Sequence, residues 1–169
     1  MHSAKQHKTA LFIGRFQPFH NGHFYSLRKC LEIAGGVIVG IGSSQESGTL
    51  DNPWDYETRK KMVQSLSESS LKVLKVVALP DYPSDEEWIK ETVECVGTFD
   101  VVVSNNEWTL SVFREAGYPV LASGLYRRDE LEGKKIREMM REGDERWRLR
   151  VPEQVVRLVQ PTMYVSGQA

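Results

Sequence analysis

The chain has 169 residues, a length that suits one domain with a hydrophobic core of ordinary size. Its 22 Lys and Arg residues nearly balance its 23 Asp and Glu residues, whereas a general nucleic-acid or membrane-surface binder would carry a basic excess. Residues 1–8 are polar and lack the apolar region of a signal peptide, and no apolar run approaches membrane-spanning length. We therefore expect a cytoplasmic protein without nucleic-acid or membrane partners, with a flexible segment at 1–8 and a single domain over 9–169.

The first half of the chain alternates between two kinds of pattern. An apolar run at 10–13 predicts a strand, and apolar residues at helical spacing over 24–34 predict a helix after it. Gly35 and Gly36 predict a break before a second buried strand at 37–42.

A polar loop then leads to the next strand and helix pairs. The loop covers 43–53, and the pattern from 54 to about 67 is helical again. A β-branched run at 71–79 predicts the third strand. Ser84 and the acidic residues after it have the composition of a helix start, and that helix runs to about Val96.

The second half continues the alternation and then becomes mostly helical. Residues 99–103 predict the fourth strand, with a helix from 107 to about 116, and 120–122 predict a short fifth strand. In the last third, Gly143 and Asp144 predict a break, and Pro152 marks the first turn of a final helix.

Strands that alternate with helices imply right-handed crossovers and a parallel sheet that is covered on both faces. The predicted fold is an α/β, doubly wound (Rossmann-like) domain with a five-stranded parallel sheet and a C-terminal helical segment. In such folds the ligand lies beyond the carboxyl ends of the strands, where the strand order reverses. The loops expected at those ends are 14–23, 42–54, 79–84, 104–106 and 123–128.

The turn at 14–23 carries the most informative residues of the chain. His20 and His23 are three residues apart at a helix entry, so both can face one side. Gly22 between them lets a ligand approach the backbone closely. Free N–H groups and the positive end of the helix dipole favour an anion at such a position. The turn therefore predicts a phosphate site.

Two other interpretations of the histidines stay open from the residues alone. In the first interpretation, the two histidines would be half of a zinc site, but no Cys, Asp or Glu stands nearby in sequence to complete it. Alternatively, His20 caps the helix and His23 fills a polar gap in the core. The cysteines, Cys30 and Cys95, match neither a metal-ligand spacing nor a disulfide framework, so we expect two buried thiols in a reducing compartment.

The stretch from Gly14 to His23 resembles the signature of the His-x-Gly-His nucleotidyltransferase superfamily. Its Gly-Arg-Phe-Gln-Pro-Phe-His form is most similar to the archaeal-type nicotinamide-nucleotide adenylyltransferases, and the similarity continues in order to about residue 160. The further matching stretches are 41–45, 52–54, 59, 88–89, 103–106, 125–127, 141–144 and 151–153. The resemblance implies transfer of AMP from ATP to the 5′-phosphate of nicotinamide mononucleotide (NMN), which gives NAD and pyrophosphate without a covalent enzyme intermediate.

The resemblance also implies roles for residues of the first turn and of later loops. His20 and His23 would hold the ATP phosphates, with His20 beside the α-phosphate, and Arg15 would add charge near the phosphate chain or the nucleophile. Other residues assigned to ATP are Gly14, Phe16, Gly22, Asn105, Arg127, Gly133 and Lys134, with Arg127 favoured over Arg128. Mg²⁺ would bridge phosphate oxygens with few direct protein ligands, so no protein metal site is expected. The resembled enzymes assemble as homo-oligomers, which we expect here too.

A second phosphate site is implied at 131–137, where the family carries a Ser/Thr-rich turn followed by an arginine. Gly133 and Arg137 match that pattern, and Arg137 is the expected pyrophosphate ligand. The hydroxyl positions instead read Glu132 and Lys134. A lysine can replace a hydroxyl contact with a point charge, whereas a glutamate repels phosphate unless it turns to solvent or binds a metal.

The resemblance assigns four residues to the acceptor. Trp88 matches the tryptophan that stacks on the pyridine ring, and Asn52, Trp54 and Arg59 match the border of the NMN pocket. The residue patterns offer plainer interpretations as well. Trp88 also fits the apolar stripe of its own helix, and Arg59 fits a solvated basic face.

Two alternative functions stay open. The first is an adenylyl- or cytidylyltransferase for another phosphorylated acceptor, such as phosphopantetheine, flavin mononucleotide or a small phospho-alcohol. The second is a noncatalytic nucleotide-binding module, in which the altered turn at Glu132 and Lys134 has removed the chemistry while ATP still binds. Pyrophosphate release in the presence of each acceptor separates these functions.

Overall fold

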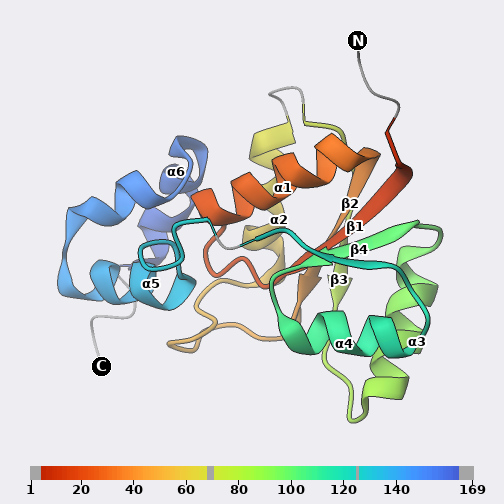
Figure 1. Ribbon diagram of the computed structural model, residues 1–169. Coiled ribbons are helices and arrows are strands. Elements are labelled where there is room, and N and C mark those ends of the chain that lie inside the picture. The colour runs from red at the N-terminus through yellow and green to blue at the C-terminus, as the bar shows by residue number, and fades with distance from the viewer. Residues whose placement is uncertain (1–4, 68–70, 125, 164–169) are drawn as a thin grey trace.

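The computed structural model describes residues 5–67, 71–124 and 126–163. Its described strands form one parallel sheet in the order β3-β2-β1-β4-β5 (Figure 1). The strands are β1 (His7–Gly14), β2 (Ala34–Gly42), β3 (Val73–Leu79), β4 (Val101–Ser104) and β5 (Val120–Ala122). This is the predicted doubly wound α/β arrangement. The strand order reverses between β1 and β4, and the loops after these two strands therefore diverge.

Side chains alternate between the two faces of the sheet, as strand geometry requires. In β1, Ala10 and Phe12 enter one hydrophobic cluster, while Leu11 and Ile13 enter a second cluster on the other face. Both clusters are buried. The strands therefore appear in the sequence as nearly continuous apolar runs and not as an apolar and polar alternation.

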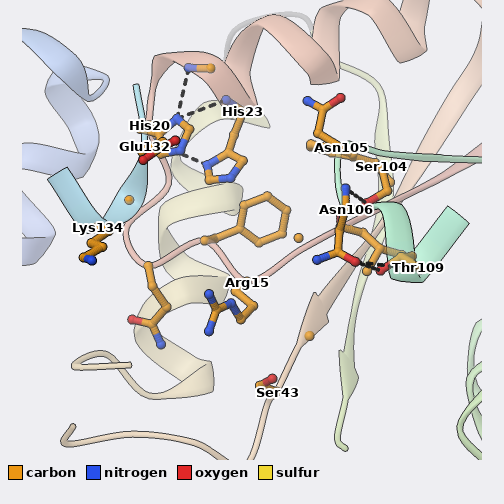
Figure 2. A pocket seen from close by; sticks show the side chains of 18 of the residues that line it. Arg15, His20, His23, Ser43, Ser104, Asn105, Asn106, Thr109, Glu132 and Lys134 are labelled. Carbon is orange, nitrogen blue, oxygen red and sulfur yellow. Dashed lines mark hydrogen bonds between the residues drawn. The ribbon is translucent and has the colours of Figure 1, made fainter. Parts of the chain in front are cut away.

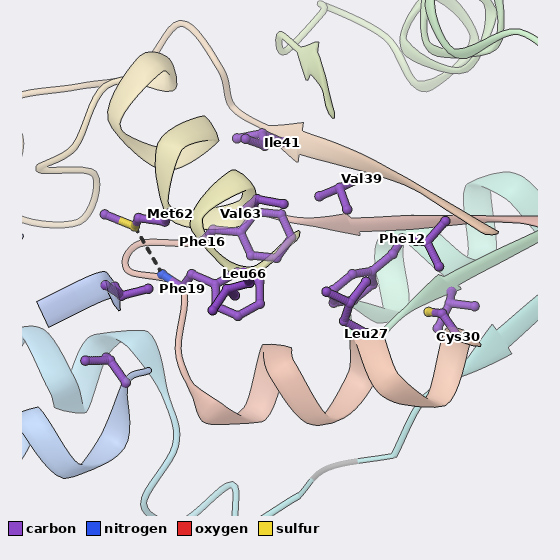
Figure 3. Packing of buried hydrophobic residues seen from close by; sticks show 14 of the residues in the cluster. Phe12, Phe16, Phe19, Leu27, Cys30, Val39, Ile41, Met62, Val63 and Leu66 are labelled. Carbon is purple, nitrogen blue, oxygen red and sulfur yellow. Dashed lines mark hydrogen bonds between the residues drawn. The ribbon is translucent and has the colours of Figure 1, made fainter. Parts of the chain in front are cut away.

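Two helices cover each face of the sheet (Figure 1). On one face lie α1 (Asn21–Ile33) and α2 (Tyr56–Ser67), and on the other lie α3 (Asp85–Val96) and α4 (Glu107–Glu115). The first turn is fixed to α2, because the backbone N–H of Phe19 donates to Sδ of Met62 at 3.5 Å (Figure 3). No helix within the described ranges has both the length and the apolar character that crossing a bilayer requires.

The C-terminal segment stands beside α1 and α2 (Figure 1). It comprises α5 (Gly133–Glu142), a 3₁₀-helix η1 (Glu145–Arg150) and α6 (Glu153–Met163). Gly143 ends α5 in the left-handed conformation with φ of 72°, which confirms the predicted break. Trp147 and Val155 are buried in the same cluster as Met62. This packing extends the core and brings the N-terminus of α5 next to the turn after β1.

Three sequence expectations that concern the helices, the strands and their burial need correction. Gly35 and Gly36 do not form a break, because β2 begins directly after α1 at Ala34. A Cβ on Gly36 would lie 2.8 Å from the side chain of Leu74, so close packing and not a turn explains this glycine. Residues 7 and 8, expected in the flexible segment at 1–8, belong to β1, which begins at His7. Residues 1–4 and 164–169 lie outside the described ranges.

The third correction concerns the thiols. Cys30 is buried under α1, and burial raises the pKa of its thiol to about 12. Cys95, expected to be buried, is exposed in the last turn of α3.

Candidate active site

A cleft of about 580 Å³ opens at the carboxyl ends of the strands, between the N-termini of α1, α4 and α5 (Figure 2). It lies at the point where the strand order reverses, as predicted for this fold. Residues that line it include Gly14, Arg15, Phe16, Gln17, His20, Gly22, His23, Ser43, Asp81, Trp88, Asn105, Asn106, Trp108, Tyr126, Arg128, Glu132, Gly133, Lys134 and Arg137.

The two histidines form a reciprocal cap at the start of α1 (Figure 2). Nδ1 of His20 accepts the backbone N–H groups of Gly22 at 3.1 Å and of His23 at 3.4 Å. In return, Nδ1 of His23 accepts the backbone N–H of His20 at 3.2 Å. Because each Nδ1 is an acceptor, the proton of each neutral imidazole is on Nε2. Each ring therefore presents an N–H donor on the edge opposite its capping nitrogen.

Burial keeps both imidazoles neutral. It lowers the pKa of His20 to about 3, because desolvation disfavours the charged ring. Burial also lowers the pKa of His23 well below its ordinary value, with a further contribution from His20, whose ring centroid is 3.6 Å away. At neutral pH the pair supplies hydrogen bonds, and the positive charge of the cleft comes from other residues.

The capping and ligand-binding interpretations of the histidines are compatible. The Nδ1 atoms cap the helix, while both rings line the cleft. Among residues 5–67, 71–124 and 126–163 there is no group of three or more His, Cys, Asp or Glu side chains arranged to hold a metal ion.

Two glycines and one phenylalanine shape the first turn around the histidines. Phe16 is 1% exposed, has a φ of 54°, and packs its ring against His23 with 4.8 Å between centroids. A Cβ on Gly14 would lie 2.9 Å from the Phe16 ring, and one on Gly22 would lie 2.9 Å from Cε1 of His20. A side chain at either glycine therefore displaces an aromatic ring that builds the cleft.

Arg15 and Arg137 bring positive charge to the cleft (Figure 2 for Arg15). The guanidinium of Arg15 is exposed, with no side-chain hydrogen bond or ion pair to a described residue. Arg137 donates to the carbonyls of Gln17 at 2.7 Å and Leu50 at 3.1 Å and to Oδ1 of Asp51 at 3.2 Å. Three of its five N–H groups are therefore used, and two have no partner among the described residues.

The N-terminus of α5 faces the same cleft. Its N-cap residue, Glu132, makes no side-chain cap hydrogen bond, so the N–H groups in the first helical turn of α5 stay available to an anion. A Cβ on Gly133 would lie 3.0 Å from the carbonyl oxygen of Gln17. Glycine therefore permits the close approach of α5 to the turn at 14–23. Lys134 is exposed, lines the cleft and has no side-chain partner among the described residues (Figure 2).

Arg127 was expected to bind ATP in preference to Arg128, and the positions of the two side chains correct this expectation. Arg127 pairs with Glu130 and lines a neighbouring cavity, whereas Arg128 lines the cleft itself. The reason is a tight turn in which the backbone N–H of Leu131 donates to the carbonyl of Arg127 at 2.8 Å. With a φ of 46° at Arg127, successive side chains leave this turn on different sides.

Arg59 is a structural residue and does not line the site where NMN would bind, which corrects the prediction from resemblance. Its side chain is 0% exposed, and it does not line the cleft. Its donors bind backbone carbonyls of Arg15 at 3.0 Å, Gly42 at 2.9 Å, Ser43 at 3.1 Å, Ser44 at 3.4 Å, Glu46 at 3.3 Å and Asp55 at 3.3 Å. These carbonyls follow the strand ends, and the guanidinium supplies the donors that they need.

Asn52 and Trp54 also are not among the residues that line the cleft. Trp54 is 3% exposed, and its backbone exchanges two hydrogen bonds with the side chain of Gln17, at 2.8 and 3.1 Å. Oδ1 of Asn52 and Nε1 of Trp54 are buried without a partner in the described part of the chain. Direct contact of either side chain with a ligand in the cleft is therefore not supported.

Aromatic side chains occupy the end of the cleft formed by α3 and α4. Trp88 lines the cleft but is only 3% exposed, because it packs on Phe113 and Trp108. Trp108 is 45% exposed, and its Nε1–H donates to Oδ1 of Asp85 at 3.2 Å. Trp108 is not among the residues expected from the sequence; the available signal was an indole two residues after Asn106, the N-cap of α4.

The loop after β4 contributes two asparagines. Oδ1 of Asn106 accepts the backbone N–H of Thr109 at 2.9 Å and so caps α4 (Figure 2). Nδ2 of Asn105 donates to Oγ of Ser26 at 3.3 Å and to the carbonyl of Gly124 at 3.0 Å. Both asparagines line the cleft. Leu125, in one of the matching stretches, lies outside the described residues.

The chain is similar in sequence to known nucleotidyltransferases. A cytidylyltransferase-like family model matches residues 11–111. A nicotinamide-nucleotide adenylyltransferase of Thermococcus kodakarensis is 39% identical over 155 residues, which cover 90% of this chain and 82% of that protein. The enzyme of the same name from Archaeoglobus fulgidus is 35% identical over 156 residues, with 89% of each chain covered.

Solved structures share the fold at lower sequence identity. A bifunctional NMN adenylyltransferase/ADP ribose pyrophosphatase from Francisella tularensis, complexed with AMP and a manganese ion, superposes with a TM-score of 0.72 at 21% identity. The match covers 95% of this chain and 51% of that one. The chain therefore belongs to the cytidylyltransferase-like family and, within it, to the nicotinamide-nucleotide adenylyltransferases of archaeal type.

Proposed function

We propose that this protein transfers AMP from ATP to the 5′-phosphate of NMN, forming NAD and pyrophosphate. The observation that carries the proposal is the division of the cleft into two ends. One end combines the histidine pair, the free N-terminus of α5 and the cationic side chains, which suit a triphosphate. The other end holds Trp88 and Trp108, which suit a pyridine ring.

At the first end, the chain binds and neutralises the phosphates of ATP. The Nε2–H groups of His20 and His23 donate to phosphate oxygens, with His20 beside the α-phosphate. Arg137, Lys134 and the N–H groups from Gly133 onward bind the part that leaves as pyrophosphate. As the phosphate of NMN attacks the α-phosphorus in line, these donors stabilise the charge that develops on the transferring and leaving groups. Because the imidazoles are neutral, they act without losing a proton.

At the second end, the aromatic residues position the acceptor. Trp108 offers the exposed indole face, and Trp88 supports it from the core. The nicotinamide ring of NMN carries a positive charge, which such faces attract. Arg15, free of side-chain partners in the described chain, binds the phosphate of NMN or the phosphate chain of ATP. Gly14, Phe16, Gly22 and Asn105 shape the ATP side.

The donor set also fits Mg²⁺ carried by the nucleotide. The carboxylates lining the cleft, Asp81 and Glu132, are too few for a protein cage, and Mg²⁺ on ATP keeps most of its water ligands. When bound, Mg²⁺ supplies charge neutralisation on phosphate oxygens, beside that from the arginines. The proposal further includes a cytoplasmic homo-oligomer, and light scattering of the purified chain tests its assembly state.

A product assay tests the function. The full chain is incubated with ATP, Mg²⁺ and NMN, and both NAD and pyrophosphate are measured. We expect the two products in equal amounts. No product from ATP and NMN overturns the proposal; turnover of CTP, phosphopantetheine or flavin mononucleotide in parallel reactions would assign one of the alternative transferases. ATP binding without any turnover would assign the noncatalytic module.

A further inference from the structure

Arg128 and Glu132 form an ion pair at the entrance to α5, and both line the cleft. Nε of Arg128 donates to Oε1 of Glu132 at 3.2 Å, and Nζ of Lys135 lies 4.0 Å from Oε2. The side chains of the pair are partly exposed, at 62% for Arg128 and 37% for Glu132. Figure 2 shows Glu132 on the same side of the cleft as His20 and Lys134.

A carboxylate in this position is unexpected in a site that binds a triphosphate. Glu132 is the N-cap residue of α5, yet its carboxylate does not cap the helix. Left alone, its charge would repel phosphate at the helix terminus. Its contacts with Arg128 and Lys135 offset that charge and leave the N–H groups of the first turn free.

The same contact gives Arg128 a defined position. Glu132 uses the Nε–H of Arg128, and the four N–H groups on its two Nη atoms stay available, which is the fork that binds phosphate oxygens. An arginine side chain without such a partner loses more rotamer entropy when it binds a ligand. The carboxylate therefore pre-orients a phosphate donor.

We propose that Glu132 is a positioning residue that holds Arg128 in place to bind the polyphosphate of ATP. The inference rests on ATP being the substrate, as proposed above. If Glu132 only repelled phosphate, removing its negative charge would tighten the binding of ATP. The inference predicts the opposite, a weaker binding of ATP.

The chain contains a matched control next to this pair. Arg127 and Glu130 also form an ion pair close to a turn, with side chains 57% and 40% exposed. They line a neighbouring cavity of about 720 Å³ and not the cleft. Substitutions there change the net charge of the same loop by the same amount, so they separate a specific contact from general attraction.

Calorimetric titration of the full chain with ATP and with AMP tests the inference without needing turnover. The variants are Arg128→Gln, Glu132→Gln, the double variant, Arg127→Gln and Glu130→Gln. We expect each single change in the Arg128 pair to raise the Kd of ATP by about tenfold, the scale of one charge-assisted hydrogen bond. AMP should be affected less, since it lacks the β- and γ-phosphates. The double variant should bind ATP no more weakly than Arg128→Gln does, because the glutamate acts through the arginine.

Several outcomes overturn the inference. Tighter ATP binding by Glu132→Gln would mean that the carboxylate only repels phosphate, and equal losses in the control pair would mean that the loop acts by net charge alone. Unchanged ATP binding in all variants would place Arg128 outside the phosphate site. Thermal unfolding of each variant checks its folding, and Glu132→Asp, which keeps the charge on a shorter arm, should give an intermediate Kd. If the wild-type chain does not bind ATP at all, the proposed function fails and this inference fails with it.

Discussion

In the proposed mechanism, each histidine of the pair serves both the fold and the reaction. Nδ1 of His20 is used by the helix, since it accepts two backbone N–H groups. The opposite edge of the ring is left for the ligand. Loss of the imidazole therefore has two separable consequences, one for the free energy of unfolding and one for kcat.

A comparison of His20→Ala with His20→Asn separates those consequences. His20→Ala removes the cap and should lower the free energy of unfolding by about 1 kcal/mol. Asparagine is a good N-cap residue, so His20→Asn should keep stability close to that of the wild type. Both variants lose the Nε2–H donor, and kcat should fall by about tenfold or more in each. Urea unfolding and steady-state kinetics measure the two effects; a His20→Asn variant with normal kcat would restrict His20 to capping.

Substitution of Trp108 tests the end of the cleft at which we propose that NMN binds. Trp108→Leu removes the exposed aromatic face and should raise the KM for NMN by about fivefold, the scale of an aromatic contact. The KM for ATP should not change. Trp108→Phe keeps a ring and should lie close to the wild type. Kinetics with each substrate varied in turn provide the measurement, and equal changes in both KM values would point to a general structural defect.

At the scale of elements, one guanidinium connects the ends of β1 and β2 with the start of α2. Arg59 binds the carbonyl of Arg15 in the first turn and the carbonyls of Gly42 and Ser43 after β2. These contacts hold the segment after β1 and the segment after β2 against the start of α2. Burial lowers the pKa of Arg59, but an arginine stays charged at any physiological pH.

Replacement of this residue tests its structural role. Arg59→Lys keeps the charge but cannot reach several carbonyls at once, so buried acceptors lose their donors. We expect a loss of about 3 kcal/mol in the free energy of unfolding, as for a broken buried hydrogen-bond network. Lys61→Ala, on an exposed position of the same helix, should change stability by less than about 0.5 kcal/mol. Urea unfolding of both variants is the measurement, and similar small effects would contradict the role of Arg59.

At the scale of the whole molecule, distant segments meet at the cleft. The N-terminus of α5 reaches the first turn because η1 and α6 pack into the core, with Trp147 and Val155 buried beside α2. Nη1 of Arg137 then donates to the carbonyl of Gln17, 120 residues earlier. The N-termini of α1 and α5, which we propose bind the phosphates, are therefore held next to each other by the main hydrophobic core.

The buried histidines make stability depend on pH. In the unfolded chain their pKa is about 6.5, whereas in the folded protein His20 has a pKa of about 3. Between these values the unfolded state binds more protons, so the free energy of unfolding falls as the pH is lowered. The loss approaches about 1.4 kcal/mol per pH unit for each such histidine.

Urea unfolding at pH 7 and pH 5 measures this dependence. We expect the wild type to lose more stability between these values than His20→Asn does, since the variant has one buried neutral histidine fewer. His7→Gln, which removes a histidine outside the pair, is the control. Equal losses in the wild type and His20→Asn would show that other groups govern the acid sensitivity.

The sequence by itself determined the succession of strands and helices along the chain, the doubly wound fold and the place of the turn at Gly14–His23 at the cleft. These features depend on periodicity, caps and turn residues, which act between neighbours in the chain. Only the tertiary structure decided that Arg59 is buried, that Arg128 and not Arg127 lines the cleft, and that Trp108 stands beside Trp88. The direction of a long side chain depends on the acceptors and surfaces that remote segments bring to it. For Arg59 these include the carbonyl of Arg15, 44 residues away, and no local pattern could reveal such a contact.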